Sequence, residues 1–241
     1  MGLISLAATD STNTEAARRL PALTPPVWIT AERQSAGRGR RGRAWAGAPG
    51  NLAATLVIPA SASAPDQARR SFVAALAVHD ALSALTGRRE AFALKWPNDV
   101  LLHGGKLAGI LLESLGRGSH LAIGIGINLA AAPDLRPEAG APAPTSLPAA
   151  GLPALTPGAV LPALARAMSG RLAEEAAHGF APIRAAWLAR AAGRGGQVTA
   201  RTGAGTLTGR FEGLDGSGAL ILATESGMRR VAAADVMLAG G

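Results

Sequence analysis

Strand-like runs follow one another in the middle of the chain with only short breaks between them. They cover residues 92–102, 107–114 and 120–129. Gly104 and Gly105 supply a tight turn after the first run, so the first two runs are expected to form a hairpin. An apolar helical repeat over residues 68–87 precedes them, and Gly87 is placed to be its C-cap. This order predicts a sheet covered by helices, a mixed α/β (α+β) fold.

The two ends of the chain follow different patterns. Strand-like runs at residues 27–34 and 51–59 belong with the central sheet, and Thr156 begins a pair of helices after a Pro- and Ala-rich stretch. After Gly193 the pattern changes to short alternating strands with glycine turns, which is typical of a small β-barrel. We therefore expect a larger domain over residues 1–192 and a small barrel domain over residues 193–241.

The composition excludes several classes of protein. A hydrophobic content of 48% with 17% charged residues is typical of a globular chain, and no uninterrupted apolar run reaches the roughly 18 residues of a membrane span. The first residues carry no basic region before an apolar core, so we expect no signal peptide and a cytoplasmic location. The absence of cysteine excludes disulfides, thiolate metal sites and cysteine nucleophiles.

The segment GRGRRGR at residues 37–43 is the most basic part of the chain. Five arginines and no acid fall within residues 33–43, so the net charge of +8 is largely local. Glycines let a backbone approach a ligand and rearrange, and arginines bind carboxylate and phosphate oxygens through two donors. A solvated loop or a nucleic-acid-binding arm is the alternative. The position between two strand-like runs favours a site loop, which we expect to become ordered over an anion.

Two lysines stand out because every other basic residue among the 24 is arginine. Lys95 and Lys106 flank the break Pro97-Asn98-Asp99, which predicts a bulge or turn at the rim of the sheet. A compact ammonium acts as a point charge, which the planar guanidinium does not reproduce. A hairpin would bring Lys106 beside Asp99, where the carboxylate could bind a magnesium–phosphate group or orient a nucleophile. A simple salt bridge remains equally open.

Two further segments allow both a structural and a functional interpretation. Thr12 and Glu15 match a helix capping box, but Ser11 and Thr12 could also bind a polar ligand at the helix start. In residues 123–128, IGIGIN, a strand would place the isoleucines on one face and the glycines and asparagine on the other. The bare glycine face could carry a flat ligand or pack closely against a helix.

Taken together and in this order, five segments resemble the biotin protein ligases. The segments are STN, ERQSAGRGRRGRAW, KWPND, GGKLAGIL and GIGINL, and they run from Ser11 to Asn128. The resemblance continues more weakly through residues 144–147 into the terminal barrel. It implies a catalytic domain with a mixed sheet, like that of class II aminoacyl-tRNA synthetases, and a small Src-homology-3-like barrel.

The family chemistry that the resemblance implies has two steps. ATP and biotin form biotinyl-5′-AMP with release of pyrophosphate, and a lysine of a biotin carboxyl carrier protein then displaces AMP. Mg²⁺ would come with ATP and would not be held at a fixed metal site. The expected partner is the carrier domain of acetyl-CoA carboxylase or another acyl-CoA carboxylase, with no nucleic acid and no membrane. The protein itself would be a monomer or a homodimer.

The resemblance also assigns roles to residues of this chain. Catalysis is assigned to Lys106, Arg38, Arg40 and Asp99. Biotin binding is assigned to Ser11, Thr12, Asn13, Gln34, Gly37, Arg38, Lys106, Gly124 and Gly126. Binding of ATP or the adenylate is assigned to Arg38, Arg40, Arg43, Trp45, Asn98, Lys106 and Asn128.

Ligases that also repress transcription carry a winged-helix domain before the Ser-Thr-Asn motif. That motif begins here at residue 11, so a ligase without the DNA-binding domain is expected. Two other functions stay open at this point. A lipoate or octanoate ligase or transferase shares the catalytic fold, although the Gly-Arg segment favours biotin. A nucleic-acid-binding protein is disfavoured, because residues 194–241 offer Phe211 as their only aromatic side chain for stacking bases.

Overall fold

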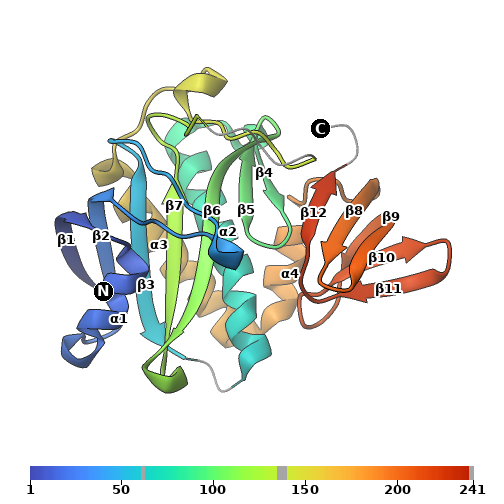
Figure 1. Cartoon of the computed structure of the whole chain (residues 1–241), viewed down its shortest axis with the longest axis horizontal. Coiled ribbons are helices and arrows are strands. Elements are labelled where there is room, and N and C mark those ends of the chain that lie inside the picture. Colours follow the sequence, from blue (N-terminus) through green and yellow to red (C-terminus); the bar gives the residue numbers. More distant parts are fainter. Residues whose placement is uncertain (61–62, 135–139, 239–241) are drawn as a thin grey trace.

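The structure is a computed structural model that describes residues 1–60, 63–134 and 140–238. A large sheet covered by helices is followed by a smaller sheet at the C-terminal end of the molecule (Figure 1). The mixed α/β architecture expected from the sequence is confirmed. None of the described helices is long and apolar enough to cross a membrane.

The large sheet has seven strands in the order β1-β2-β3-β7-β6-β5-β4. Only β1 and β2 pair in parallel; every other neighbouring pair is antiparallel. The sheet is therefore mixed, with β1 at one edge and β4 at the other. The strands are β1 (Gly2–Thr9), β2 (Val27–Gln34), β3 (Leu52–Pro59), β4 (Phe92–Lys95), β5 (Asp99–Leu102), β6 (Gly105–Leu115) and β7 (His120–Ile127).

The run over residues 92–102 is two strands, where the sequence suggested a single interrupted one. β4 and β5 form an antiparallel hairpin in which Lys95 pairs with Asp99 across a turn of three residues, 96–98. Asn98 holds the turn in place, since its Nδ2 donates to the Ile110 carbonyl of β6 at 2.6 Å. The expected interruption is thus a tight turn at the end of the hairpin.

Helices cover the two faces of the large sheet unequally. The long helices α2 and α3 pack on one face, while α1 and the segment of residues 35–50 lie on the other (Figure 1). Gly87 ends α2 in the left-handed conformation with φ of 67°, as expected for a helix C-cap. Thr156 caps α3 by accepting from Ala159 N. The helices are α1 (Thr12–Arg19), α2 (Ala64–Thr86), α3 (Pro157–His178) and α4 (Phe180–Leu188).

Alternation along β7 decides which side of the sheet becomes core. Ile123, Ile125 and Ile127 are buried in the core cluster that includes residues of α2, whereas Gly124 and Gly126 face the opposite side. The predicted division of this strand into an isoleucine face and a glycine face is confirmed. Because glycine has no side chain, β7 itself contributes no bulky group at Gly124 and Gly126 to the face where α1 and residues 35–50 lie.

The small sheet is antiparallel and has the strand order β11-β10-β9-β8-β12. It is docked on the large unit by buried contacts. Trp96 Nε1 donates to the Gly218 carbonyl at 3.0 Å, and a Cβ on Gly218 would lie 2.6 Å from the Phe72 ring. The strands are β8 (Gln197–Thr202), β9 (Gly205–Leu214), β10 (Leu220–Thr224), β11 (Gly227–Val231) and β12 (Asp235–Leu238).

Candidate active site

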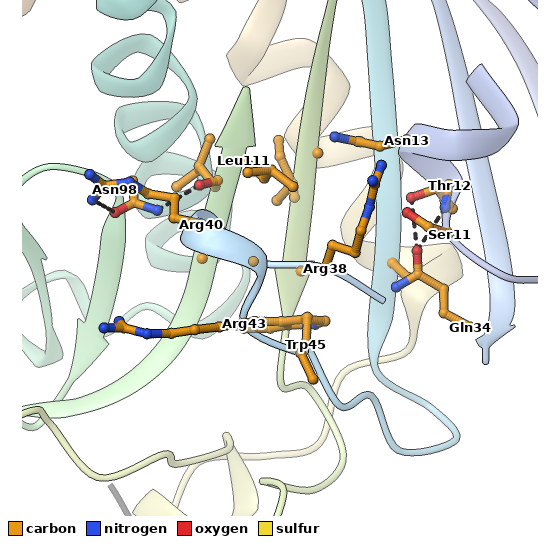
Figure 2. A pocket seen from close by; sticks show the side chains of 18 of the residues that line it. Ser11, Thr12, Asn13, Gln34, Arg38, Arg40, Arg43, Trp45, Asn98 and Leu111 are labelled. Carbon is orange, nitrogen blue, oxygen red and sulfur yellow. Dashed lines mark hydrogen bonds between the residues drawn. The ribbon is translucent and has the colours of Figure 1, made fainter. Parts of the chain in front are cut away.

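A cavity of roughly 150 Å³ opens on the glycine face of the large sheet. Its walls come from the start of α1, the end of β2, the Gly-Arg segment, and strands β6 and β7. We call this cavity the main pocket. Figure 2 shows its two ends, with Ser11, Thr12 and Gln34 on one side and Arg40 and Asn98 on the other. Arg38 lies between them and extends toward Asn13.

The α1 end of the main pocket is a network of buried hydroxyl and amide groups. The backbone N–H and the hydroxyl of Thr12 both donate to Gln34 Oε1, at 2.8 and 3.1 Å. Thr55 Oγ1, a group that the sequence did not single out, donates to Asn13 Oδ1 at 2.6 Å. The capping-box interpretation is wrong, because Ser11 is the N-cap and Glu15 pairs with Arg18 and Arg19. These polar groups therefore lie at the pocket wall without serving as a helix cap.

Two glycines of β7 are needed because other residues pass directly over them. A Cβ on Gly124 would lie 2.5 Å from Asn13 Oδ1, and one on Gly126 would lie 2.4 Å from the Trp45 indole. Real Cβ contacts are not this short, so a side chain would displace either neighbour. Close packing against the protein's own groups accounts for both glycines: Asn13 of α1 lies over Gly124, and the Trp45 indole lies over Gly126.

The arginines of residues 37–43 are each matched by an acceptor from a distant part of the chain. Arg38 pairs with Glu113 of β6 at 3.1 Å, and Arg40 Nη1 donates to Asn98 Oδ1 at 3.1 Å. Arg41 and Arg43 both pair with Asp235 of β12, at 2.6 and 2.7 Å. Carboxylates thus offset the repulsion expected within this segment. Neither Glu113 nor Asp235 was identified from the sequence.

A carboxylate between two lysines lies where the main pocket meets the β4–β5 hairpin. Lys106 Nζ is 2.7 Å from Asp99 Oδ1, so the predicted pairing of these two side chains across the hairpin is confirmed. Lys95 Nζ is 3.8 Å from Asp99 Oδ2. Burial lowers the pKa of Lys95, with the charge of Asp99 acting in the opposite direction, and burial likewise lowers the pKa of Arg40. Positive charge is concentrated at this end of the pocket, and Lys106 also lies 5.8 Å from the Trp45 ring centroid.

Most residues predicted for the site come together at the main pocket. Gly37 and Asn128 do not line it. Asn128 is buried beneath it, where its Nδ2 donates to the Thr145 carbonyl at 3.0 Å, and Gly37 is buried against the backbone of Trp45. The predicted residues on its lining are Ser11, Thr12, Asn13, Gln34, Arg38, Arg40, Arg43, Trp45, Asn98, Asp99, Lys106, Gly124 and Gly126.

The chemistry of this arrangement suits an anionic ligand that is held at both ends. One end offers neutral hydrogen-bonding groups, and the other offers guanidinium and ammonium groups around Asp99. Within the described ranges, no three His, Asp or Glu side chains lie close enough together to hold a metal ion. The guanidinium and ammonium groups of the positive end can stabilise phosphate or carboxylate oxygens.

Two family models match the chain over the regions that form the two sheets. The model of the Biotin/lipoate A/B protein ligase family matches residues 5–129. The model of the Biotin protein ligase C terminal domain matches residues 195–238. The chain belongs to the biotin/lipoate protein ligase family. The first match contains the lining residues of α1, the Gly-Arg segment and strands β5 to β7, and the second contains Asp235.

Individual members of the biotin/lipoate protein ligase family match nearly the whole chain. A biotin–[acetyl-CoA-carboxylase] ligase of Paracoccus denitrificans is 50% identical over 239 residues, which cover 98% of this chain and 100% of that protein. The bifunctional ligase/repressor BirA of Bacillus subtilis is 32% identical over 214 residues, covering 87% of this chain and 65% of BirA. The structure of a biotin protein ligase from Aquifex aeolicus in complex with biotin and ATP is similar at a TM-score of 0.84, with 26% identity and 99% of each chain covered. The expected biotin ligase fold, with a mixed sheet and a small C-terminal β domain, is confirmed.

Proposed function

We propose that this protein is an ATP-dependent biotin protein ligase that joins biotin to a lysine of a biotin carboxyl carrier protein. The observation that carries the proposal is the main pocket itself. It joins a neutral polar end at Ser11, Thr12 and Gln34 to a cationic end at Arg40 and Lys106. The near-full-length similarity to a biotin–[acetyl-CoA-carboxylase] ligase supports it.

The neutral end of the main pocket suits the ureido ring of biotin. We assign Ser11, Thr12, Asn13 and Gln34 to this ring, which has both N–H donors and a carbonyl acceptor. Gly124 and Gly126 would make room on the sheet for Asn13 and Trp45 beside the ligand, and Arg38 would close over its aliphatic tail, with Gly37 behind it against the Trp45 backbone. The hydrogen bonds that now join Thr12 to Gln34 hold these groups in place before the ligand arrives.

The cationic end suits the first chemical step. An oxygen of the biotin carboxylate attacks the α-phosphorus of ATP, the bond to the bridging oxygen breaks, and pyrophosphate leaves. Two anions must approach each other, so Lys106, Arg38 and Arg40 would offset their repulsion and the charge that develops. Arg43 and Asn98 would contact the phosphate groups, and Trp45 would pack on the adenine.

The second step needs an uncharged amine to reach the mixed anhydride. The carrier lysine attacks the acyl carbon, the bond from that carbon to the AMP oxygen breaks, and the amine loses a proton as the amide forms. Asp99 lines the cationic end and would orient the entering lysine. Its two oxygens face Lys106 at 2.7 Å and Lys95 at 3.8 Å.

Mg²⁺ would accompany ATP and pyrophosphate, bound mainly by phosphate oxygens. The lining fits this role. Among its described residues, Asp99 and Asp235 supply the carboxylates, and both already pair with lysine or arginine side chains, so the phosphate oxygens would be the main ligands of the ion. We propose the carrier domain of acetyl-CoA carboxylase or a related acyl-CoA carboxylase as the partner and the cytoplasm as the location. The division into a catalytic domain over residues 1–192 and a small domain over residues 193–241 is part of the proposal.

A direct test incubates the protein with ATP, Mg²⁺ and a carrier domain, together with biotin, lipoate or octanoate in separate reactions. Intact-mass spectrometry of the carrier should detect one added biotinyl group, and a carrier whose acceptor lysine is replaced by arginine should stay unmodified. Modification with lipoate or octanoate, and none with biotin, would overturn the proposal in favour of the other branch of the family.

A further inference from the structure

Glu113 of β6 lies next to the α1 end of the main pocket, although it does not line the cavity itself. It pairs with Ala122 of β7, so its side chain extends from the same face of the sheet as Gly124. One oxygen of its carboxylate, Oε2, accepts two hydrogen bonds. Asn13 Nδ2 donates to it at 2.7 Å and Arg38 Nη2 at 3.1 Å. Glu113 therefore joins a residue of α1 to a residue of the Gly-Arg segment.

The contact with Glu113 decides which way the Asn13 amide points. A carboxylate accepts hydrogen bonds and does not donate them, so only the NH2 group of the amide can face it. The amide oxygen is thereby turned toward Thr55, whose hydroxyl donates to it at 2.6 Å. The Asn13 amide is thus held at both ends, and its orientation is set by the carboxylate.

This orientation controls the hydroxyl groups further along the network. Thr55 has a single hydroxyl proton, and the oxygen of Asn13, which can only accept, takes it. The Thr12 hydroxyl lies 2.8 Å from Thr55 Oγ1 and 3.1 Å from Gln34 Oε1, so its own proton goes to one of these two oxygens. If the Asn13 amide were turned round, its NH2 group would donate to Thr55, and Thr55 would donate to Thr12 instead. Glu113 therefore keeps the Thr12 oxygen available as an acceptor.

The two contacts of Glu113 differ in how tightly they are held. Asn13 is 3% exposed and packs on Gly124, where a Cβ would lie 2.5 Å from its Oδ1, so this contact is fixed. The ion pair with Arg38 is open to solvent, since the two side chains are 46% and 30% exposed, and pairs of this kind break and form easily. Figure 2 shows Arg38 extending toward Asn13. Glu113 is thus a fixed point at the α1 end to which the Gly-Arg segment closes.

We propose, on the basis of the function proposed above, that Glu113 is a positioning residue that controls both biotin recognition and closure of the Gly-Arg segment. By orienting the Asn13 amide, it leaves the Thr12 oxygen to accept from an N–H group of the ureido ring. By pairing with Arg38, it holds the segment over the same end of the pocket. An acceptor kept for a ligand N–H favours biotin over lipoate and octanoate, whose dithiolane ring and alkyl chain have no N–H group.

The test compares Glu113→Gln with the wild-type protein. Glutamine keeps the length of the side chain, but its amide can present a donor or an acceptor to Asn13 and carries no charge for Arg38. Biotin affinity, measured by calorimetry, should fall about tenfold, and escape of biotinyl-5′-AMP, measured by chromatography, should accelerate by about the same factor.

Glu212→Gln is the matched control for this variant. Glu212 is also a strand glutamate that pairs with an arginine, and its side chain is 31% exposed against 30% for Glu113. It does not line the main pocket, so Glu212→Gln should leave biotin affinity and adenylate escape at their wild-type values.

Double variants separate positioning from a general structural role. In an Asn13→Ala background there is no amide to orient, so adding Glu113→Gln should weaken biotin binding further by at most about twofold. In an Arg38→Ala background, adding it should not accelerate adenylate escape further. A general loss of structure would instead add its full effect in both backgrounds.

The outcomes distinguish this inference from the proposed function. Wild-type biotin affinity in Glu113→Gln, or fully additive losses in the double variants, would overturn the role of Glu113. If the wild-type protein biotinylates its carrier while Glu113→Gln behaves like Glu212→Gln, this inference fails and the proposed function stands. If the wild-type protein binds biotin but transfers none to a carrier, the proposed function fails, while the biotin affinities of the variants still decide the role of Glu113.

Discussion

Lys106 is the residue on which the charge distribution of the site most depends. It lines the main pocket, pairs with Asp99 at 2.7 Å and lies 5.8 Å from the centre of the Trp45 ring. Lys106→Ala should lower the rate of adenylate formation by about 10²- to 10³-fold, because a cation at the reacting centre is lost. Pyrophosphate release in the absence of carrier measures this step.

The variant Lys106→Arg refines that prediction. It keeps the positive charge but replaces a compact ammonium by a planar fork, so it should restore only part of the rate. Pyrophosphate release near the wild-type rate in Lys106→Ala would refute the assigned role. Full recovery in Lys106→Arg would mean that charge alone matters at this position.

Gly126 tests whether the close approach of Trp45 to the sheet is needed. A Cβ at this position would lie 2.4 Å from the indole, so Gly126→Ala must displace the ring. Because Trp45 is assigned to the adenine, we expect the KM for ATP to rise about tenfold with little change in biotin affinity. Gly213→Ala is the control, since a Cβ on that strand glycine meets no atom within 4 Å. Equal KM values for the two variants would contradict the prediction.

At the scale of elements, the Gly-Arg segment links parts of the molecule that are far apart in sequence. Arg38 reaches Glu113 of β6, and Arg41 reaches Asp235, which is 194 positions away. Each ion pair is partly exposed and contributes little alone, about 0–1 kcal/mol. Several weak contacts of this kind hold a segment in place while letting it open, which is what a lid over a reactive intermediate requires.

The lid interpretation predicts what happens to the intermediate when Arg38 is removed. Arg38→Ala should accelerate the escape of biotinyl-5′-AMP into solution by about tenfold to a hundredfold, since a bidentate cation over the ligand is lost. Chromatography of the free and protein-bound adenylate measures this directly. Arg41→Ala is the matched control from the same segment, because Arg41 does not line the main pocket. Equal retention of the adenylate in Arg38→Ala and wild type would contradict the lid.

Elements with strong periodicity could be predicted from the sequence, and those defined by their neighbours could not. The alternation of Ile and Gly in β7 and the glycine after α2 predicted local structure correctly. β1 was missed because it is an edge strand with mostly exposed or half-buried residues, so it carries no clear apolar pattern. The hairpin at residues 96–98 was hidden because its two strands are buried at every position but Ala93, so they resemble one apolar run in the sequence.

The candidate site was predictable to the extent that its residues lie in recognisable segments. Lys106 and Asp99 are joined by a local hairpin, so their contact followed from the sequence. Glu113 and Asp235 carry no local signal, because their roles arise only when distant strands bring them to the arginines. Long-range ion pairs of this kind depend on tertiary structure and not on sequence spacing.

At the scale of the whole molecule, the C-terminal sheet completes the cationic end of the site. Asp235 pairs with two arginines of the Gly-Arg segment, and Arg201 lines a cavity of roughly 80 Å³ that adjoins the main pocket. Burial raises the pKa of Asp235, but the hydrogen bond from Arg43 and the charges of Arg43 and Arg41 outweigh it, and the net shift is downward. The carboxylate therefore stays charged near neutral pH, and the position of this sheet affects Arg43, which we assign to the phosphate groups.

The contact that fixes this position gives a prediction for the whole molecule. Trp96 of the large unit donates to the Gly218 carbonyl of the small sheet, whereas Trp28 Nε1 has no hydrogen-bond partner within the described part of the chain. Both side chains are 2% exposed, so Trp96→Phe and Trp28→Phe remove similar buried surface. Trp96→Phe should lower the free energy of unfolding by about 1–2 kcal/mol more than Trp28→Phe, because it leaves a buried carbonyl without its donor.

The two variants should also differ in function. Loosening the small sheet in Trp96→Phe displaces Arg201 and Asp235, so the KM for ATP should rise while biotin affinity at the distant α1 end is retained. Trp28→Phe should leave both values near wild type, because Trp28 does not line the main pocket. Urea unfolding followed by circular dichroism, with initial rates at varied ATP, measures the two effects. Equal losses of stability in the two variants, or an ATP KM that stays constant in Trp96→Phe, would mean that the docking of the small sheet does not control the cationic end of the site.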